Sequence, residues 1–337
     1  MFRPLPSAVS LASAIEQGDR AALGRTITLL ESSRAEHITL ARSVIGLLEA
    51  KRPASAPPAL RIGITGAPGV GKSTFIEALG SMMVAGEHRV AVLAIDPSSS
   101  VSGGSILGDK TRMEHLSVHP RAFIRPSPAG TTLGGVAQKT RETIALVEAA
   151  NYDIVLVETV GTGQSETVVH SMTDVFLLLL LPGAGDELQG IKRGIVEMAD
   201  ILAVNKADGE RLNTARQARA HYLNAAHLLP PKKSGWEPRV VQCSALNRTG
   251  MQELWQIIQS YQQQTQQNGW FMHNRHIQAK YWLHEAIAQG LQTLLSENSH
   301  VQNLLTALET QVEKGGMSPF AAAEQVLEAF KKGIATP

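Results

Sequence analysis

Residues 66–73 have the composition and spacing of a phosphate-binding loop. Gly66-Ala-Pro-Gly-Val-Gly-Lys-Ser73 fits the pattern G-x-x-x-x-G-K-[S/T] and directly follows the β-prone run 60–65. Glycines let backbone N–H groups close around phosphates at a helix N-terminus, while lysine reaches the β and γ oxygens and a serine hydroxyl coordinates Mg²⁺. The predicted nucleotide-binding residues here are Gly66, Ala67, Pro68, Gly69, Val70, Gly71, Lys72, Ser73 and Thr74.

A second motif indicates which base is bound. Asn205-Lys206-Ala207-Asp208 follows the apolar run 201–204 and resembles the guanine-recognition motif of GTPases. An aspartate carboxylate can accept both the ring N–H and the exocyclic amine of guanine, whereas adenine presents an acceptor in place of that N–H. A solvated loop is the alternative for so short a motif. Three further residues, which follow the run 240–243, are predicted to complete the base site: Ser244, Ala245 and Leu246.

Two carboxylates stand where predicted strands end. Asp96 closes the run 89–95 and Glu158 closes the run 153–158. Acidic groups at the carboxyl edge of a parallel sheet face the bound ligand, and Mg²⁺ takes few protein carboxylates because it keeps several waters. We therefore predict a Mg²⁺ site of Ser73, Asp96 and Glu158, with helix or loop capping as the alternative for the two acids. Gly161 is predicted to place its backbone N–H on the γ-phosphate.

The elements that position these residues alternate between β-rich and helical runs. This pattern predicts an α/β fold of the P-loop NTPase kind, with a largely parallel sheet flanked by helices. The spacing from the helix near Gly71 to the next strand suits a right-handed crossover. The predicted strands are 60–65, 89–95, 153–158, 174–181, 200–204 and 239–243.

Helical extensions are predicted on both sides of this region. Residues 7–51 show helical apolar spacing, with Ser33-x-x-Glu36 as a candidate capping box, and a proline-rich linker follows at 52–59. The C-terminal part predicts helices over 275–296 and 299–313 and from Ser318 onward. The predicted domains are a helical extension (1–55), a nucleotide-binding domain (56–268) and a helical, dimerising extension (269–337).

Composition narrows the class of protein. The 337-residue chain has 31 Lys plus Arg against 30 Asp plus Glu, so no global charge draws it to nucleic acid or anionic lipid. Its one cysteine, Cys243, excludes an intrachain disulfide, and its longest purely apolar run, 175–181, is too short to span a membrane. We expect a soluble, cytoplasmic protein, with no nucleic-acid or membrane partner.

The chain resembles the methylmalonyl-CoA mutase-associated GTPases of the MeaB/ArgK type. The resemblance implies a homodimeric GTPase that assists an adenosylcobalamin-dependent methylmalonyl-CoA mutase by gating cofactor loading and protecting it from inactivation. An older label for such proteins is an arginine/ornithine transport kinase. The motifs that carry the resemblance are Gly66–Thr74, Ile95–Ser100, Val157–Glu166, Pro182–Gly190 and Asn205–Asp208.

The same resemblance implies three switch segments, at 96–132, 158–166 and 183–194. It adds Asp109 in the first and Lys192 in the third as functional candidates. A solvated, charged helix start is the alternative for Lys192. The predicted catalytic residues are Lys72, Asp96, Asp109, Glu158, Gly161 and Lys192.

One departure from small signalling GTPases bears on the rate. Their water-positioning glutamine directly follows the switch glycine, whereas here Thr162 follows and Gln164 comes three residues after Gly161. We therefore expect slow intrinsic hydrolysis that rises when the partner or second subunit supplies a group. The candidate charge donors to the transition state are Lys110, Arg112, Lys192 and Arg193.

Three other functions are alternatives to a mutase-associated GTPase. A nickel-enzyme metal-insertion GTPase should carry Cys-x-x-Cys or a His-rich tract, and this chain offers one cysteine and the histidine pairs 115/119 and 273/276. A kinase or transport ATPase for a basic metabolite would need no guanine preference. A structural adaptor would not need this set of γ-phosphate and Mg²⁺ candidates. The sequence has no D-x-H-x-x-G motif, so the corrinoid would belong to the mutase.

Overall fold

The computed structural model describes residues 5–53, 55–95, 113–126, 133–159, 165–183 and 193–334. The chain divides into two compact units, Met1–Gln278 and Ala279–Pro337. The first unit contains the sheet and every described residue of the predicted site. The predicted domain boundaries at 55/56 and 268/269 stay predictions.

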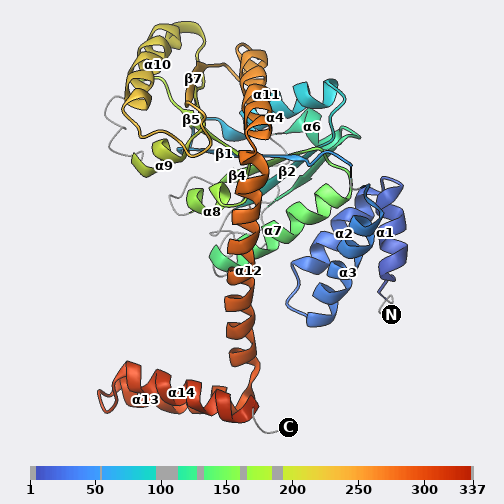
Figure 1. Ribbon diagram of the computed structural model, residues 1–337, viewed down its shortest axis with the longest axis vertical. Helices are drawn as coiled ribbons and strands as arrows, with labels where there is room; N and C mark the ends of the chain where they lie inside the picture. Colours follow the sequence, from blue (N-terminus) through green and yellow to red (C-terminus); the bar gives the residue numbers. More distant parts are fainter. Residues whose placement is uncertain are drawn as a thin grey trace. The chain divides into compact units, whose positions relative to one another are not determined.

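In the described part of the chain, seven parallel strands form one sheet in the order β3-β2-β4-β1-β5-β6-β7 (Figure 1). Every residue of β1, β2, β4, β5 and β6 is buried, as expected for a parallel sheet covered on both faces. The α/β prediction is therefore confirmed. The strands are β1 (Leu60–Gly66), β2 (Val90–Ile95), β3 (Ala122–Arg125), β4 (Ile154–Thr159), β5 (Val175–Leu180), β6 (Ile201–Val204) and β7 (Arg239–Gln242).

Strand β1 lies where the strand order reverses. It pairs with β4 on one side and with β5 on the other. The connection from β1 through the next helix leads to β2, and the connection after β4 leads across to β5. Ligands of open α/β sheets bind beyond the carboxyl ends of the strands at such a point. The fold thus puts the loop that follows β1 where a ligand is expected.

Helices cover both faces of the sheet. Figure 1 shows α4 and α11 on one side and α7 and α8 on the other. Ile62 and Ile64 of β1 pack in one core with Phe75 and Leu79 of α4 and Ile258 of α11. These helices of the first unit are α4 (Lys72–Ala85), α6 (Glu114–Val118), α7 (Leu133–Ala149), α8 (Glu166–His170), α9 (Arg193–Met198), α10 (Leu212–His227) and α11 (Met251–Gln267).

Three N-terminal helices precede the sheet: α1 (Ala8–Glu16), α2 (Arg20–Leu30) and α3 (Ala35–Lys51). The predicted capping box Ser33-x-x-Glu36 is wrong, because Arg34 is the N-cap of α3 and makes no side-chain capping bond. Ser32 Oγ instead accepts from the Arg34 N–H at 3.1 Å. Ser32, rather than Ser33, thus accepts a backbone N–H just before the helix.

The C-terminal helices are α12 (Trp270–Glu297), α13 (Ser299–Glu313) and α14 (Pro319–Ile334). In the second unit α13 and α14 pack through a small apolar cluster that includes Val301, Leu308 and Val326. Helix α12 begins in the first unit and continues in the second. Among the described helices, none combines the length and apolar character needed to cross a membrane.

Candidate functional site

The predicted phosphate-binding loop connects β1 to α4. A Cβ on Gly66 would lie 2.7 Å from the Leu179 carbonyl oxygen, so no larger residue fits where β1 passes β5. Gly71 has φ +93°, and a Cβ there would lie 3.2 Å from Asn205 Nδ2. Gly71 is also the N-cap of α4 and makes no side-chain capping bond. The first N–H groups of α4 are therefore open to a phosphate.

Lys72 is the first residue of α4 and is almost fully buried. Its Nζ donates to the carbonyl oxygens of Gly66 at 2.7 Å and Ala67 at 3.3 Å. Burial lowers the pKa of the Lys72 ammonium, and the negative charges of Glu158 and Glu166 partly offset that effect. The ammonium thus lies inside the loop that would hold the phosphates. Its neighbours in α4 are the half-buried Ser73 and the exposed Thr74.

Glu158 lies next to last in β4, the strand between β1 and β2. Its register partners are Ile64 of β1 and Ala94 of β2, which places it near the carboxyl ends of both strands. The side chain is buried, and it acts electrostatically on Lys72. Beside it, Thr159 Oγ1 donates to Thr65 Oγ1 at 2.8 Å across β4 and β1. A buried carboxylate beside the loop has the chemistry of a Mg²⁺ ligand or of a holder of its water shell.

Asn205 connects the phosphate loop to the predicted guanine loop. It follows β6, and its side chain is buried. Asn205 Nδ2 donates to the Val70 carbonyl oxygen at 2.9 Å, and Asn205 Oδ1 accepts from the Ala245 N–H at 3.1 Å. The next residue, Lys206, has φ +58°, and its Nζ donates to the Gly69 carbonyl oxygen at 2.7 Å. Three motifs that lie far apart in the sequence therefore meet.

Asp208 and Ser244 also lie together. The Ser244 hydroxyl donates to Asp208 Oδ2 and accepts from the Asn247 N–H at 3.1 Å. The Ala207 N–H donates to the Cys243 carbonyl oxygen at 3.0 Å, which joins the two loops through the backbone. This arrangement orients the Asp208 carboxylate. Leu246, at the end of the same loop, is 78% exposed and thus has its apolar surface available.

Several predicted residues lie outside the described part of the chain. Asp96, Asp109, Gly161 and Lys192 belong to this group, and their roles stay predictions. The same holds for the predicted charge donors Lys110 and Arg112, for Thr162 and Gln164, and for the side chain of Arg193.

Two features were not predicted from the sequence. Glu166, placed only at the end of a switch segment, is buried at the start of α8 and acts electrostatically on Lys72. Its position as the first acidic residue of a helix after a glycine-rich loop was the available signal. The other is strand β3, whose four residues lie between Pro120 and Pro126 and end in a charged arginine, so that they resemble a loop.

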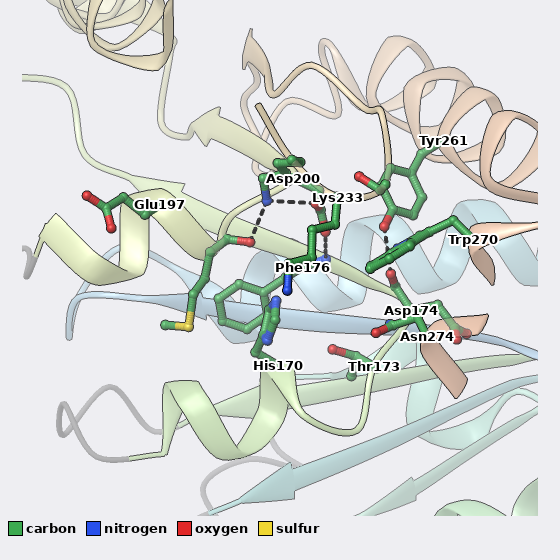
Figure 2. A pocket seen from close by; sticks show the side chains of 13 residues that line it. His170, Thr173, Asp174, Phe176, Glu197, Asp200, Lys233, Tyr261, Trp270 and Asn274 are labelled. Carbon is green, nitrogen blue, oxygen red and sulfur yellow. Dashed lines mark hydrogen bonds and ion pairs between the residues drawn. The ribbon is translucent and has the colours of Figure 1, made fainter. Parts of the chain in front are cut away.

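A cavity of about 230 Å³ lies at the opposite edge of the sheet, beside the amino ends of β5 and β6 (Figure 2). Lys232 Nζ contacts Asp200 Oδ1 at 2.8 Å and the Met198 carbonyl oxygen at 2.7 Å. The His170 ring lies edge-on to the Phe176 ring, and burial lowers the pKa of His170. The phosphate loop follows the carboxyl end of β1, so this cavity is separate from the nucleotide site. Within the described ranges, no cluster of three or more His, Cys, Asp or Glu residues could hold a metal ion.

Comparisons with known proteins agree with this geometry. The sequence matches the family described as "Methylmalonyl Co-A mutase-associated GTPase MeaB" over residues 23–300. A Caulobacter vibrioides protein named as a GTPase is 50% identical over 321 residues, which cover 95% of this chain and 97% of that protein. The mouse protein named "Methylmalonic aciduria type A homolog, mitochondrial" is 42% identical over 327 residues, 95% of this chain and 79% of its own.

Similarity extends to a solved structure. The crystal structure of a "LAO/AO transport system kinase" is 33% identical, with a TM-score of 0.73, and the match covers 98% of this chain and 100% of that chain. The family match spans most of the chain, and the match covers 97% of the Caulobacter relative and 79% of the mouse relative. With its P-loop fold and the three joined motifs, this chain therefore belongs to the methylmalonyl Co-A mutase-associated GTPase MeaB family.

Proposed function

We propose that this GTPase binds GTP and GDP with Mg²⁺, hydrolyses GTP slowly by itself, and is a switch and chaperone for adenosylcobalamin-dependent methylmalonyl-CoA mutase. One observation supports the nucleotide assignment above the others. Asn205 bonds to both the phosphate loop, at the Val70 carbonyl, and the loop at Ala245. If the phosphates of a nucleotide lie at the N-terminus of α4, its base would lie against Asp208.

The proposed roles follow the chemistry of each group. Lys72 contacts the β- and γ-phosphates, and the open N-terminus of α4 donates its N–H groups to them. Asp208 selects guanine, with Ser244 orienting its carboxylate. Gly161 donates its N–H to the γ-phosphate, and Asp109 and Lys192 respond to nucleotide and partner. The predicted slow rate rests on Thr162, which occupies the position after the switch glycine.

The described residues fit a Mg²⁺ site. Ser73 is half-buried at the start of α4, and Glu158 offers a buried carboxylate beside the same loop. Together with Asp96 they would hold the ion. When bound, Mg²⁺ neutralises charge on the β- and γ-phosphates.

The family description supports the mutase as partner, and the chain would supply the switch while the mutase supplies the corrinoid. GTP hydrolysis removes the γ-phosphate contacts and so provides two states that load and release a partner. Self-association is supported by a row of exposed apolar side chains on α12: Leu283, Ile287, Leu291 and Leu294. We propose a homodimer formed by the C-terminal extension, working in the cytoplasm.

GTP and ATP turnover by the purified protein, with and without equimolar methylmalonyl-CoA mutase, tests the proposal. GTP-selective turnover that is slow alone and faster in a co-eluting complex is the expected result. If the mutase neither co-elutes nor changes the rate, the partner assignment is wrong while the GTPase assignment stands. Transfer of the γ-phosphate to arginine or ornithine instead of water would favour a transport-linked kinase.

A further inference from the structure

Three side chains on one face of the first turns of α12 contact the rest of the first unit. Phe271, Arg275 and Gln278 are spaced four and three residues apart, as one helical face requires. Phe271 joins the apolar core, the Arg275 guanidinium lies 4.7 Å from the centre of its ring, and Gln278 Nε2 donates to the Thr173 carbonyl oxygen at 2.7 Å. Within α12, Phe271 and Gln278 are the buried residues. This attachment thus combines one apolar side chain with two polar ones.

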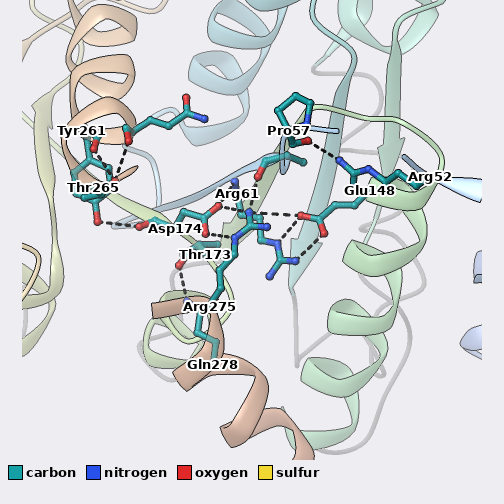
Figure 3. A network of polar contacts seen from close by, with 12 residues as sticks. Arg52, Pro57, Arg61, Glu148, Thr173, Asp174, Tyr261, Thr265, Arg275 and Gln278 are labelled. Carbon is teal, nitrogen blue, oxygen red and sulfur yellow. Dashed lines mark hydrogen bonds and ion pairs between the residues drawn. The ribbon is translucent and has the colours of Figure 1, made fainter. Parts of the chain in front are cut away.

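Arg275 belongs to a cluster of four charges, shown in Figure 3: Arg61, Glu148, Asp174 and Arg275. Its Nε and Nη2 contact Asp174 Oδ1 at 2.8 Å and Oδ2 at 2.6 Å. Arg61 Nε and Nη2 contact Glu148 Oε1 at 2.6 Å and Oε2 at 2.7 Å, and Arg275 Nη2 lies 3.8 Å from Glu148. Arg275 Nη2 also donates to the Ala59 carbonyl oxygen. Both arginines thus pair in the two-bond geometry that fixes orientation as well as distance.

Burial gives this charge cluster little value as a simple stabiliser. The side chains of Arg275 and Asp174 are 12% and 2% exposed. Removing charges from water costs several kcal/mol per ion, so well-packed apolar residues often stabilise such a site at least as well. Burial alone would lower the pKa of Arg275. The charges of Asp174 and Glu148 and the bond to Asp174 outweigh burial and raise the pKa, so the guanidinium stays charged. What the pairs add is a defined position of α12 relative to its partners.

Those partners lie on elements that lead to the nucleotide site. Arg61 is on β1, which ends at Gly66 of the phosphate loop. Asp174 lies between α8, which begins with Glu166, and β5. At the other end of β5, the Leu180 carbonyl oxygen accepts a hydrogen bond from the Asn205 N–H at 2.9 Å. A displacement of α8 or β5 would therefore move the carboxylate that holds Arg275.

Asp174 itself is held on several sides. Its Oδ2 accepts from the Arg61 N–H at 2.8 Å, and its carbonyl oxygen accepts from the Tyr261 hydroxyl at 3.0 Å. By contrast, Gln278 Oε1 is buried and finds no hydrogen-bond partner among the described residues. A buried carbonyl oxygen without a hydrogen bond lowers stability, so Gln278 adds less to the packing of α12 than a fully bonded side chain would. The bond between Arg275 and Asp174 is the paired, charged contact that holds this part of α12.

We propose that the charge cluster couples the nucleotide site to α12: the nucleotide state shifts α8 and β5, Asp174 changes its hold on Arg275, and α12 docks or loosens at residues 271–278. This inference rests on the proposed GTP-binding function, and it deepens that function by assigning the path of regulation. It gives Arg275 a positioning role far from the phosphates, with no contact to the nucleotide.

Hydrogen exchange of peptides that cover 270–280 tests the proposal in the full-length protein. The exchange rate is compared between the GDP state and the state with a non-hydrolysable GTP analogue. Coupling free energies between sites correspond to factors of about 5 to 150, so a nucleotide-dependent change of at least ~5-fold is expected in the unchanged protein. In Arg275→Gln the difference should fall below about 2-fold, and Arg275→Lys should retain part of it because the charge remains.

The matched control is Arg42→Gln, which removes an arginine–glutamate pair between α3 and α7. Arg42 Nη2 contacts Glu142 Oε1 at 2.5 Å, but the Arg42 side chain is 55% exposed. This control should keep the full nucleotide-dependent difference. GTP turnover and nucleotide affinity of all variants are measured alongside, and a merely structural role for Arg275 would change exchange equally in both nucleotide states.

The outcomes separate the two proposals. If the unchanged protein turns over GTP but residues 270–280 exchange at the same rate in both nucleotide states, the coupling proposal is wrong and the GTPase function stands. If Arg275→Gln and Arg275→Lys both keep the full difference, coupling does not pass through Arg275. If the unchanged protein shows no GTP turnover or guanine-nucleotide binding, the proposed function itself fails. Should Arg275→Gln not fold, Arg275→Lys alone carries the test.

Discussion

At the scale of single residues, the site depends on polar side chains held by the backbone of other loops. Lys72 Nζ donates to two carbonyl oxygens of its own loop, and Asn205 connects that loop to Ala245. The ammonium of Lys72 is therefore positioned by the backbone of the loop that would hold the phosphates. Such placement lowers the ordering cost of binding.

Replacing Lys72 by alanine should abolish detectable GTP hydrolysis and sharply weaken nucleotide binding, because it removes the only charge that the phosphate loop itself supplies. Losing a charge-assisted bond costs about 1.5–3 kcal/mol, or roughly 10- to 150-fold in affinity. Titration with a fluorescent GDP analogue and a phosphate-release assay measure both effects. The control is Lys331→Ala, an exposed lysine of α14. Near-normal turnover in Lys72→Ala would refute the site.

Replacing Asp208 by asparagine should weaken GTP and leave ATP binding unchanged. The new side-chain amide would present a donor to the guanine ring N–H, and the bond from Ser244 to the charged carboxylate would be lost. We expect GTP affinity to fall about 10- to 100-fold, as for the loss of one or two bonds to a charged group. Competition of GTP, ITP and ATP for the same site measures the selectivity. An unchanged preference for GTP over ATP would disprove guanine recognition by Asp208.

Cys243 should be unreactive in the folded protein. The thiol is buried against Asn205, and burial raises its pKa to about 12 from an ordinary value near 9. A folded-state pKa above the unfolded value means that the neutral thiol is preferred, so its contribution to stability is complete below pH 9 and is lost as the pH rises toward 12. At pH 8, reaction with a disulfide reagent should be roughly a hundredfold or more slower than in urea. Fast labelling of folded protein would contradict this environment.

At the scale of elements, the sequence predicts those strands whose apolar runs are long and bounded by clear turns. All six predicted strands occur within about one residue of their predicted ends, because a buried parallel strand needs a nearly continuous apolar run. Strand β3 was not predicted, because its four residues lie between Pro120 and Pro126 and end in a charged arginine, which is typical of a loop. The start of α12 at Trp270 was also missed, because its first turn mixes aromatic and polar residues.

The same limit applies to the site. The motifs at Gly66, Asn205 and Ser244 can be found in the sequence because each needs its residues adjacent along the chain. The proximity of Glu166 to Lys72, and of Arg275 to Asp174, depends on the fold, since the members of each pair lie about a hundred residues apart. No local pattern encodes such pairs.

One contact that should help to hold the N-terminal helices to the sheet is made by Glu31, the residue after α2. Its carboxylate pairs with Arg125 at the end of β3, and its carbonyl oxygen accepts from Lys139 Nζ of α7 at 2.6 Å. The Glu31 and Arg125 side chains are 16% and 25% exposed. Glu31→Gln should therefore lower the free energy of unfolding by about 1–3 kcal/mol, since it leaves a mostly buried arginine poorly paired.

Thermal and urea unfolding measure this effect, with Glu36→Gln as the control. Glu36 lies 3.6 Å from Arg34, with both side chains about two-thirds exposed at 66% and 68%. Exposed pairs contribute little, so the control should change stability by less than about 1 kcal/mol. Equal effects of the two substitutions would mean that Glu31 does not hold the N-terminal helices.

At the scale of the whole molecule, α12 presents two different kinds of surface along its length. Its first turns attach to the GTPase unit through Phe271, Arg275 and Gln278, and its later turns expose the apolar row. The row contains Leu283, Ile287, Leu291 and Leu294, each between 51% and 58% exposed. Their spacing of four, four and three residues puts them on one side of the helix, where a second copy of α12 could cover them.

The double substitution Ile287→Lys and Leu291→Lys should therefore convert the proposed dimer into a monomer. Burying both side chains against a partner would contribute roughly 1.5–3 kcal/mol each per subunit, and two lysines would add like-charge repulsion. Light scattering after size exclusion should change from twice the 36.2 kDa chain mass to that mass. The control Gln292→Lys adds a charge at an exposed polar position of the same helix and should stay dimeric. If the double variant keeps the dimer mass while retaining its helical content, the interface lies elsewhere and the apolar row serves another partner.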